Sequence, residues 1–216
     1  MCVYPGLMTH FARVERAALI EALRDAGPDA PTLCEGWTAR DLAAHVVARE
    51  RRADAAGIVI KSLAPRLARV QAEYAALPWD ELLGLVVAGP PRKSVFSIPG
   101  VDELANLVEF FVHCEDVRRA RGGWEPRRLE SGVVEALWRR VGGMAKLVGR
   151  RSPVGLVVRR PDGQSVVVRK GAPVATVTGE PGELVVFLSG RQGHAVVEVE
   201  GPEEAVAAVR GARFGV

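Results

Sequence analysis

The segment from Asn106 to Ala120, NLVEFFVHCEDVRRA, places a glutamate and a histidine four residues apart in a largely apolar run. In an α-helix, residues four apart lie one above the other, so Glu109 and His113 would project together from one face. A carboxylate and an imidazole at this spacing could both bind one ion held between helices. An ordinary ion pair on an exposed helix face, which stabilises a helix by about 0.2–0.5 kcal/mol, remains an open alternative.

His45 is the third candidate donor, because it lies inside another strongly apolar helical segment. In an antiparallel bundle, a residue midway along one helix can meet a residue midway along another. His45, Glu109 and His113 would then form a two-histidine, one-carboxylate set that leaves coordination positions for water or substrate. From spacing alone, His45 could equally be a core histidine that is hydrogen-bonded to a carbonyl group.

The charged residues that follow His113 allow two interpretations. Arg118 is our candidate catalytic residue, because it could reach a carboxylate substrate near the ion. The alternative for Arg118 is a salt bridge to Asp116 or to another acidic residue of the bundle. Glu115 and Asp116 are expected to pair with nearby arginines. Cys114 lies about 100° around the helix from His113, so we expect it to pack as a small apolar group.

Helical periodicity in the first 150 residues predicts the elements that would position these side chains. The first helix ends by Gly27, and the second begins at Trp37–Thr38, where Thr38 and Asp41 have the spacing of a capping box. We assign Asp41 to this cap and Trp37 to packing. Further helical segments are APRLARVQAEYAALPWDELLGLVVAG, broken near Leu77–Pro78, then ELANLVEFFVHCEDVRRARGGW, capped by Asp102, and ESGVVEALWRRVGGMAKLVG.

The pattern changes to period two from Val154 onward, which is typical of strands. Two strands joined at Asp162–Gly163 form the strongest hairpin signal in the chain. The segments that follow are PVATVTG as a strand, EPGELVVFLSGR as a short helix, HAVVEVEG as a strand and PEEAVAAVRGA as a final helix. The sequence therefore predicts a mixed fold, with a four-helix bundle over residues 1–150 and a small α+β domain over residues 151–216.

Composition narrows the class of protein. The net charge of +3 is small and aromatic residues are only 6% of the chain, so a nucleic-acid-binding surface with stacking aromatics is not expected. Three cysteines at unpaired spacings favour a reducing, cytoplasmic setting. No apolar run reaches the roughly 18 residues that a membrane span needs, so no membrane partner is expected. The sequence does not indicate an oligomeric state.

Two motifs resemble a known family. The segments LCEGWTARDLAAHVVARE and EFFVHCEDVRRA closely resemble the mycothiol-dependent maleylpyruvate isomerase family of actinobacteria, a branch of the DinB/YfiT-like metal-binding four-helix bundles. The tail VTGEPGELVVFLSGRQGHAVVEVEGPEEAV resembles the sterol-carrier-like C-terminal domain of that family. The resemblance implies that His45, Glu109 and His113 are the ligands of a divalent ion, usually zinc.

The resemblance also implies a class of reaction. An accessible Zn²⁺ ion can bind a small thiol, such as mycothiol, and favour its thiolate, which adds to a small electrophile. The expected activity is that of a mycothiol-type isomerase or S-transferase, and the subgroup and its substrate are open. Arg191, in LSGRQGH, is a candidate for binding acidic groups of the thiol cofactor. The alternative is a module that binds metal or a small ligand without catalysis.

Overall fold

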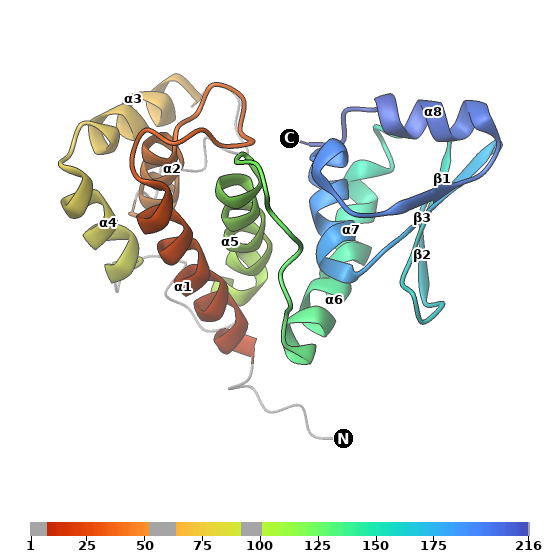
Figure 1. Cartoon of the computed structure of the whole chain (residues 1–216), viewed down its shortest axis with the longest axis horizontal. Helices are drawn as coiled ribbons and strands as arrows, with labels where there is room; N and C mark the ends of the chain where they lie inside the picture. Colours follow the sequence, from red (N-terminus) through yellow and green to blue (C-terminus); the bar gives the residue numbers. More distant parts are fainter. Residues whose placement is uncertain (1–7, 52–63, 92–100, 216) are drawn as a thin grey trace. The chain divides into compact units, whose positions relative to one another are not determined.

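The computed structural model describes residues 8–51, 64–91 and 101–215 (Figure 1). The chain divides into two compact units, Met1–Trp124 and Glu125–Val216. The N-terminal unit is helical, and the C-terminal unit combines helices with a small sheet. The predicted mixed fold, helical first and α+β second, is therefore confirmed.

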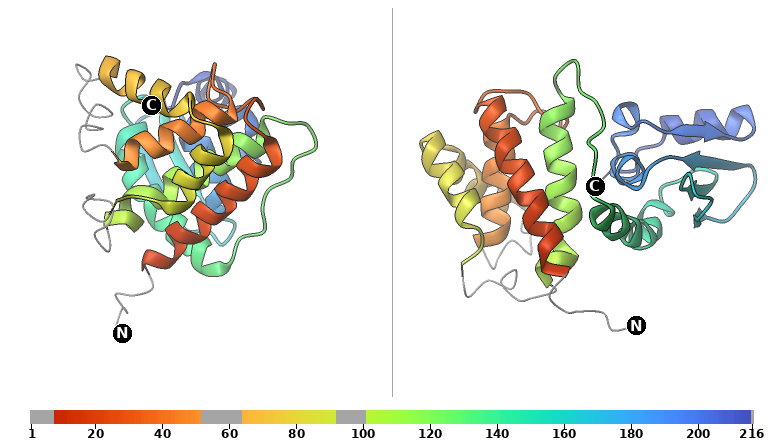
Figure 2. Two further views of the ribbon diagram at one scale, coloured as in Figure 1. Left: turned by 90° about the vertical axis from the view of Figure 1, so that its left-hand side faces the viewer. Right: turned by 60° about the horizontal axis from the view of Figure 1, so that its bottom comes forward.

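The helices of the N-terminal unit pack around one apolar core. The longest of them, α1 and α5, lie against each other, and α2 packs against α3 and α4 (Figures 1 and 2). Fully buried side chains at the centre include Leu19, Leu42, Leu82 and Phe110. The helices are α1 (Met8–Ala26), α2 (Ala39–Arg51), α3 (Ala64–Ala75), α4 (Trp79–Ala88) and α5 (Val101–Arg119). The expected break near Leu77–Pro78 separates α3 from α4, and α5 begins one residue before the expected cap, Asp102.

Thr38 and Asp41 form the capping box that the sequence predicts at the start of α2. The backbone N–H and the hydroxyl of Thr38 both donate to Oδ2 of Asp41, at 2.9 and 2.7 Å. In return, the N–H of Asp41 lies 3.3 Å from Oγ1 of Thr38. Aspartate is one methylene shorter than the usual glutamate but still reaches back to the capping residue, so the first turn of the helix is fixed.

A partly buried arginine, paired with a buried glutamate, links four of these helices. Arg16 of α1 forms an ion pair with Glu50 of α2, and its Nη1 also donates to the carbonyl oxygen of Val86 in α4 at 3.0 Å. Its guanidinium lies 4.4 Å from the ring centroid of Phe110 in α5. Because a buried charge requires compensating partners, this contact restricts how α1, α2, α4 and α5 can be arranged.

The C-terminal unit is built on a four-stranded sheet with the order β2-β1-β3-β4. Strands β1 and β2 form the predicted antiparallel hairpin, and Gly163 in its turn has φ 91°, a conformation that favours glycine. Strand β3 pairs with β1 in parallel and with β4 antiparallel. The elements are α6 (Ser131–Val148), β1 (Gly155–Arg159), β2 (Ser165–Arg169), β3 (Val174–Thr178), α7 (Pro181–Leu188), the 3₁₀ helix η4 (Gln192–His194), β4 (Glu198–Glu200) and α8 (Glu203–Gly211).

Two boundaries in this part of the chain differ from the sequence expectation. Helix α6 packs against α7 and β2 and so groups with the C-terminal unit, which begins before α6 and not near Gly149–Pro153. Strand β4 begins only at Glu198, because the N–H of Val196 donates to the Glu183 carboxylate at 2.7 Å and not to a neighbouring strand. The assignment of a metal-binding bundle and a sterol-carrier-like domain to the two parts stays a prediction.

Candidate metal centre

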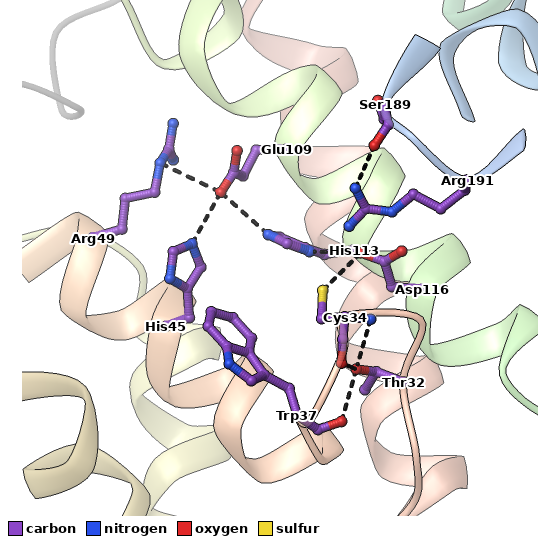
Figure 3. Close-up of polar contacts among 10 residues, drawn as sticks. All are labelled: Thr32, Cys34, Trp37, His45, Arg49, Glu109, His113, Asp116, Ser189 and Arg191. Carbon is purple, nitrogen blue, oxygen red and sulfur yellow. Dashed lines mark hydrogen bonds and ion pairs between the residues drawn. The ribbon is translucent and has the colours of Figure 1, made fainter. Parts of the chain in front are cut away.

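His45, Glu109 and His113 converge in the N-terminal unit (Figure 3). His45 is on α2, and the other two side chains project from successive turns of α5. Nε2 of His45 lies 3.3 Å from Oε1 of Glu109, and Nε2 of His113 lies 3.2 Å from the same oxygen. One donor atom from each residue lies within 4.8 Å of the other two. The expected meeting of α2 and α5 side chains is thus present.

These distances fit a zinc ion. Bonds of about 2.0–2.2 Å in a tetrahedral site place neighbouring donor atoms about 3.3–3.6 Å apart. The two nitrogen-to-oxygen distances, 3.3 and 3.2 Å, are close to that separation. The side chains of His45, Glu109 and His113 are 14%, 27% and 11% exposed, so the group is partly accessible from solvent. Three protein donors with partial exposure are typical of zinc sites that keep a position for water or substrate.

Arg49 adds a positive charge beside the three donors. It lies one turn after His45 on α2, and its Nε is 3.5 Å from Oε1 of Glu109. Its Nη1 donates to the side-chain oxygen of Asn106. Arg49 was not among the residues predicted for the site, although its spacing of four residues from His45 was a usable signal.

The second ring nitrogen of His113 meets a buried carboxylate. Nδ1 of His113 is 3.0 Å from Oδ2 of Asp116, and Sγ of Cys34 donates to the same oxygen at 3.2 Å. We expected Asp116 to pair with arginines. Glu115 binds Arg118 and Arg119, as expected, and the contacts of Asp116 with His113 and Cys34 were not anticipated. The i, i+3 spacing of His113 and Asp116 could have indicated the contact.

Electrostatics favours an ionised Glu109 and a protonated His113 in the metal-free protein. Burial by itself raises the pKa of Glu109, but hydrogen bonds from His113 and His45 and the charges of His113 and Arg49 outweigh it and hold this pKa well below 4.5. Burial by itself lowers the pKa of His113, but its contacts with Asp116, Cys34 and Glu109 outweigh it and raise this pKa well above 6.5. A proton on His113 therefore competes with any metal ion at this site.

The remaining candidate residues lie elsewhere. Arg118 donates from Nη1 to both carboxylate oxygens of Glu115, at 3.1 Å each, which is the salt bridge we gave as its alternative. Arg191 belongs to the C-terminal unit, between α7 and η4, and donates from Nη1 to the carbonyl oxygen of Ser189 at 2.5 Å. The functional roles of both arginines stay predictions. Cys114 is 1% exposed and packs in the apolar core, as expected.

Fold and site together define a class: a helical domain with a candidate metal centre, followed by an α+β domain. Residues 10–93, which lie in the N-terminal unit, match the family model described as mycothiol maleylpyruvate isomerase N-terminal domain. His45 lies inside the matched residues, whereas Glu109 and His113 follow them.

Two solved structures resemble the whole chain. The crystal structure of the mycothiol-dependent maleylpyruvate isomerase has a TM-score of 0.66 and 18% identity, over 93% of this chain and 96% of that chain. A histidine-to-alanine mutant of the mycothiol-dependent maleylpyruvate isomerase has a TM-score of 0.65 and 17% identity, over the same shares. At this identity the likeness shows the fold alone. No curated protein matches the chain. Among the described helices, none combines the length and apolar character of a membrane span.

Proposed function

We propose that this protein binds a divalent metal ion, most simply zinc, through His45, Glu109 and His113, and uses it in a thiol-dependent isomerisation or transfer reaction. The observation that carries the proposal is the convergence of three donor atoms within 4.8 Å on partly exposed side chains. The choice of a thiol as co-substrate is supported by the family match of residues 10–93 and by the mycothiol dependence stated for the two structural relatives.

The ion would supply a Lewis acid that favours the thiolate form of a small thiol at neutral pH. Glu109 and Arg49 would have different roles beside this ion. Glu109 provides negative charge, which offsets part of the charge of a divalent cation. Arg49, 3.5 Å from Glu109, adds a cation that can attract an acidic electrophile towards the same place. The substrate class we infer is therefore a small electrophile that carries a carboxylate.

Metal analysis combined with a thiol assay tests this proposal. Protein purified without added metal is analysed for zinc, and turnover of maleylpyruvate is then followed with mycothiol and with glutathione as a comparison thiol. We expect about one zinc ion per chain and turnover that requires both zinc and mycothiol. Glu109→Gln should lose both, because an amide oxygen is a weaker ligand than a carboxylate.

The control variant is Glu21→Gln, which makes the same change at an exposed position of α1. It should keep zinc and turnover. Zinc binding without turnover with any thiol would leave a metal-binding module without catalysis. A protein that binds no zinc, cobalt or manganese would contradict the proposal altogether.

A further inference from the structure

Asp116 is a fully buried carboxylate that the proposed metal site does not use as a ligand. Its side chain is 0% exposed, and its Oδ2 faces two groups, Nδ1 of His113 at 3.0 Å and Sγ of Cys34 at 3.2 Å. Burial of a charged carboxylate is costly unless hydrogen bonds compensate it. The contacts with His113 and Cys34 therefore supply hydrogen bonds that compensate the burial of the Asp116 carboxylate.

We propose that Asp116 is a positioning residue, which accepts the Nδ1–H of His113 and so directs the Nε2 lone pair towards Glu109 and His45. The inference rests on the proposed function, because it assigns Nε2 of His113 as the donor to the ion. A neutral imidazole carries its single proton on one of the two nitrogens, and the hydrogen bond made there decides which nitrogen is free to bind metal. With Asp116 on the Nδ1 side, only Nε2 is available.

Cys34, His113 and Asp116 also lie close enough together to form an ion site of their own, with donor atoms within 4.8 Å. Exposure favours the positioning role. The Asp116 carboxylate has no exposed surface, whereas the side chains of His45, Glu109 and His113 are each partly exposed. The thiol of Cys34 donates to Asp116, so it acts as a second hydrogen-bond donor that orients the carboxylate.

The backbone around Asp116 supports the same role. The N–H of Leu33 donates to the carbonyl oxygen of Asp116 at 3.0 Å, which joins the loop before α2 to α5. Within that loop, Oγ1 of Thr32 donates to the carbonyl of Trp37 at 2.8 Å and accepts from the N–H of Cys34 at 3.2 Å. The loop therefore holds the thiol of Cys34 against Oδ2 of Asp116, the same oxygen that Nδ1 of His113 contacts (Figure 3).

Trp37 extends the arrangement to the second histidine. Its ring centroid is 5.1 Å from that of His45, with the two planes tilted by 48°. One short loop thus touches His45 through Trp37 and reaches His113 through Cys34 and Asp116. Loss of the Asp116 carboxylate should release the His113 ring first, because the contact between Trp37 and His45 does not depend on it.

Nitrogen NMR of the histidine side chains tests the inference in the full chain. In the metal-free wild-type protein above the pKa of His113, we expect this histidine to carry its single proton on Nδ1, and with zinc added we expect it to bind the ion through Nε2. Asp116→Ala should give mixed tautomers and a zinc affinity lower by about 10–100-fold, the usual effect of losing such a partner. Asp116→Asn keeps an acceptor and should fall between Asp116→Ala and wild type. Asp29→Asn, at an exposed position, is the matched control and should behave as wild type.

Several outcomes would overturn the inference. One is an unchanged His113 tautomer and zinc affinity in Asp116→Ala, or in Asp116→Asn if the alanine variant does not fold. Another is a cobalt–thiolate charge-transfer band that disappears in Cys34→Ser, since Asp116 would then belong to an ion site with Cys34. If wild-type protein bound no zinc, the proposed function would fail, yet the tautomer of the metal-free protein, recorded above the pKa of His113, would still decide the role of Asp116.

Discussion

Oxygen Oε1 of Glu109 has three cationic or potentially cationic nitrogens close to it. They belong to His45, His113 and Arg49, at 3.3, 3.2 and 3.5 Å. A carboxylate in this environment stays ionised, and a doubly charged ion could replace a proton as the counter-charge between it and the imidazoles. The chemistry of the proposed site therefore depends on whether a proton or a metal ion occupies the space next to Glu109.

Replacement of His113 by alanine should separate metal binding from folding. The variant removes one of three donors, so zinc affinity should fall by more than about tenfold, since even loss of a ligand's hydrogen-bond partner typically costs that much. The helices should stay folded, because the buried apolar residues around Phe110 and Leu42 are unchanged. Equilibrium dialysis with zinc and circular dichroism would measure both effects. Unchanged zinc stoichiometry and affinity would mean that His113 is not a ligand.

Zinc affinity should depend on pH in the range set by His113. Because the pKa of His113 is raised well above 6.5 in the metal-free protein, a proton must leave when zinc binds, even above neutral pH. Affinity should therefore increase about tenfold per pH unit below that pKa and level off above it. Calorimetry in buffers of different ionisation enthalpy would detect about one proton released per zinc ion. Release of no proton at pH 7 would contradict the protonated state of His113.

His113 and Glu109 affect the stability of the metal-free protein in opposite pH ranges. His113 has a raised folded pKa, so its contribution is complete below 6.5 and is lost as pH rises through the folded value. Glu109 has a lowered folded pKa, so its contribution is present above 4.5 and is lost as pH falls through the folded value. The metal-free protein thus loses the stabilising contribution of His113 at alkaline pH, which is the range where zinc binds best.

At the level of elements, α5 supplies two donors and α2 supplies one, together with Arg49. The i, i+4 pair on α5 is a local property of a helix, so the sequence predicts it directly. The position of His45 opposite that pair required a bundle arrangement, which periodicity and the family resemblance supplied. Spacing could not decide whether Asp116 faces an arginine or His113, because both lie within one turn of the same helix.

Loss of the capping box should destabilise the element that carries His45. Asp41→Ala removes the acceptor for the N–H and the hydroxyl of Thr38, which should cost about 0.5–2 kcal/mol of unfolding free energy. Asp80→Ala, an exposed aspartate in the first turn of α4 with no side-chain cap role, is the comparison variant and should cost less. Urea denaturation followed by circular dichroism would measure both. Equal losses would indicate that the Thr38–Asp41 contacts add nothing beyond a favourable charge near a helix start.

At the level of the whole molecule, the sequence predicts the change from helices to strands but places the boundary after α6. Amphipathic helices of a bundle and of an α+β unit have the same periodicity, so the pattern of α6 cannot identify the partner against which it packs. The partners α7 and β2 follow α6 in the chain, and only the structure shows these contacts. All three candidate metal donors fall in the N-terminal unit, whereas Arg191 falls in the C-terminal unit.

Because Arg191 and the candidate metal donors lie in different units, a variant of Arg191 can test the thiol-dependent reaction separately from metal binding. Arg191→Ala should leave zinc stoichiometry and affinity unchanged, because no candidate donor is in its unit. If its guanidinium binds an acidic group of the thiol or of the electrophile, KM for that co-substrate should rise about tenfold, as expected for loss of a charged hydrogen bond of about 1.5 kcal/mol. Steady-state kinetics with each co-substrate varied in turn would identify which one is affected.

Arg210→Ala, which changes an exposed arginine on α8, is the matched control. If both variants gave the same KM values as wild type, the predicted binding role would be wrong, and the contact of Arg191 with the Ser189 carbonyl at the end of α7 would be structural.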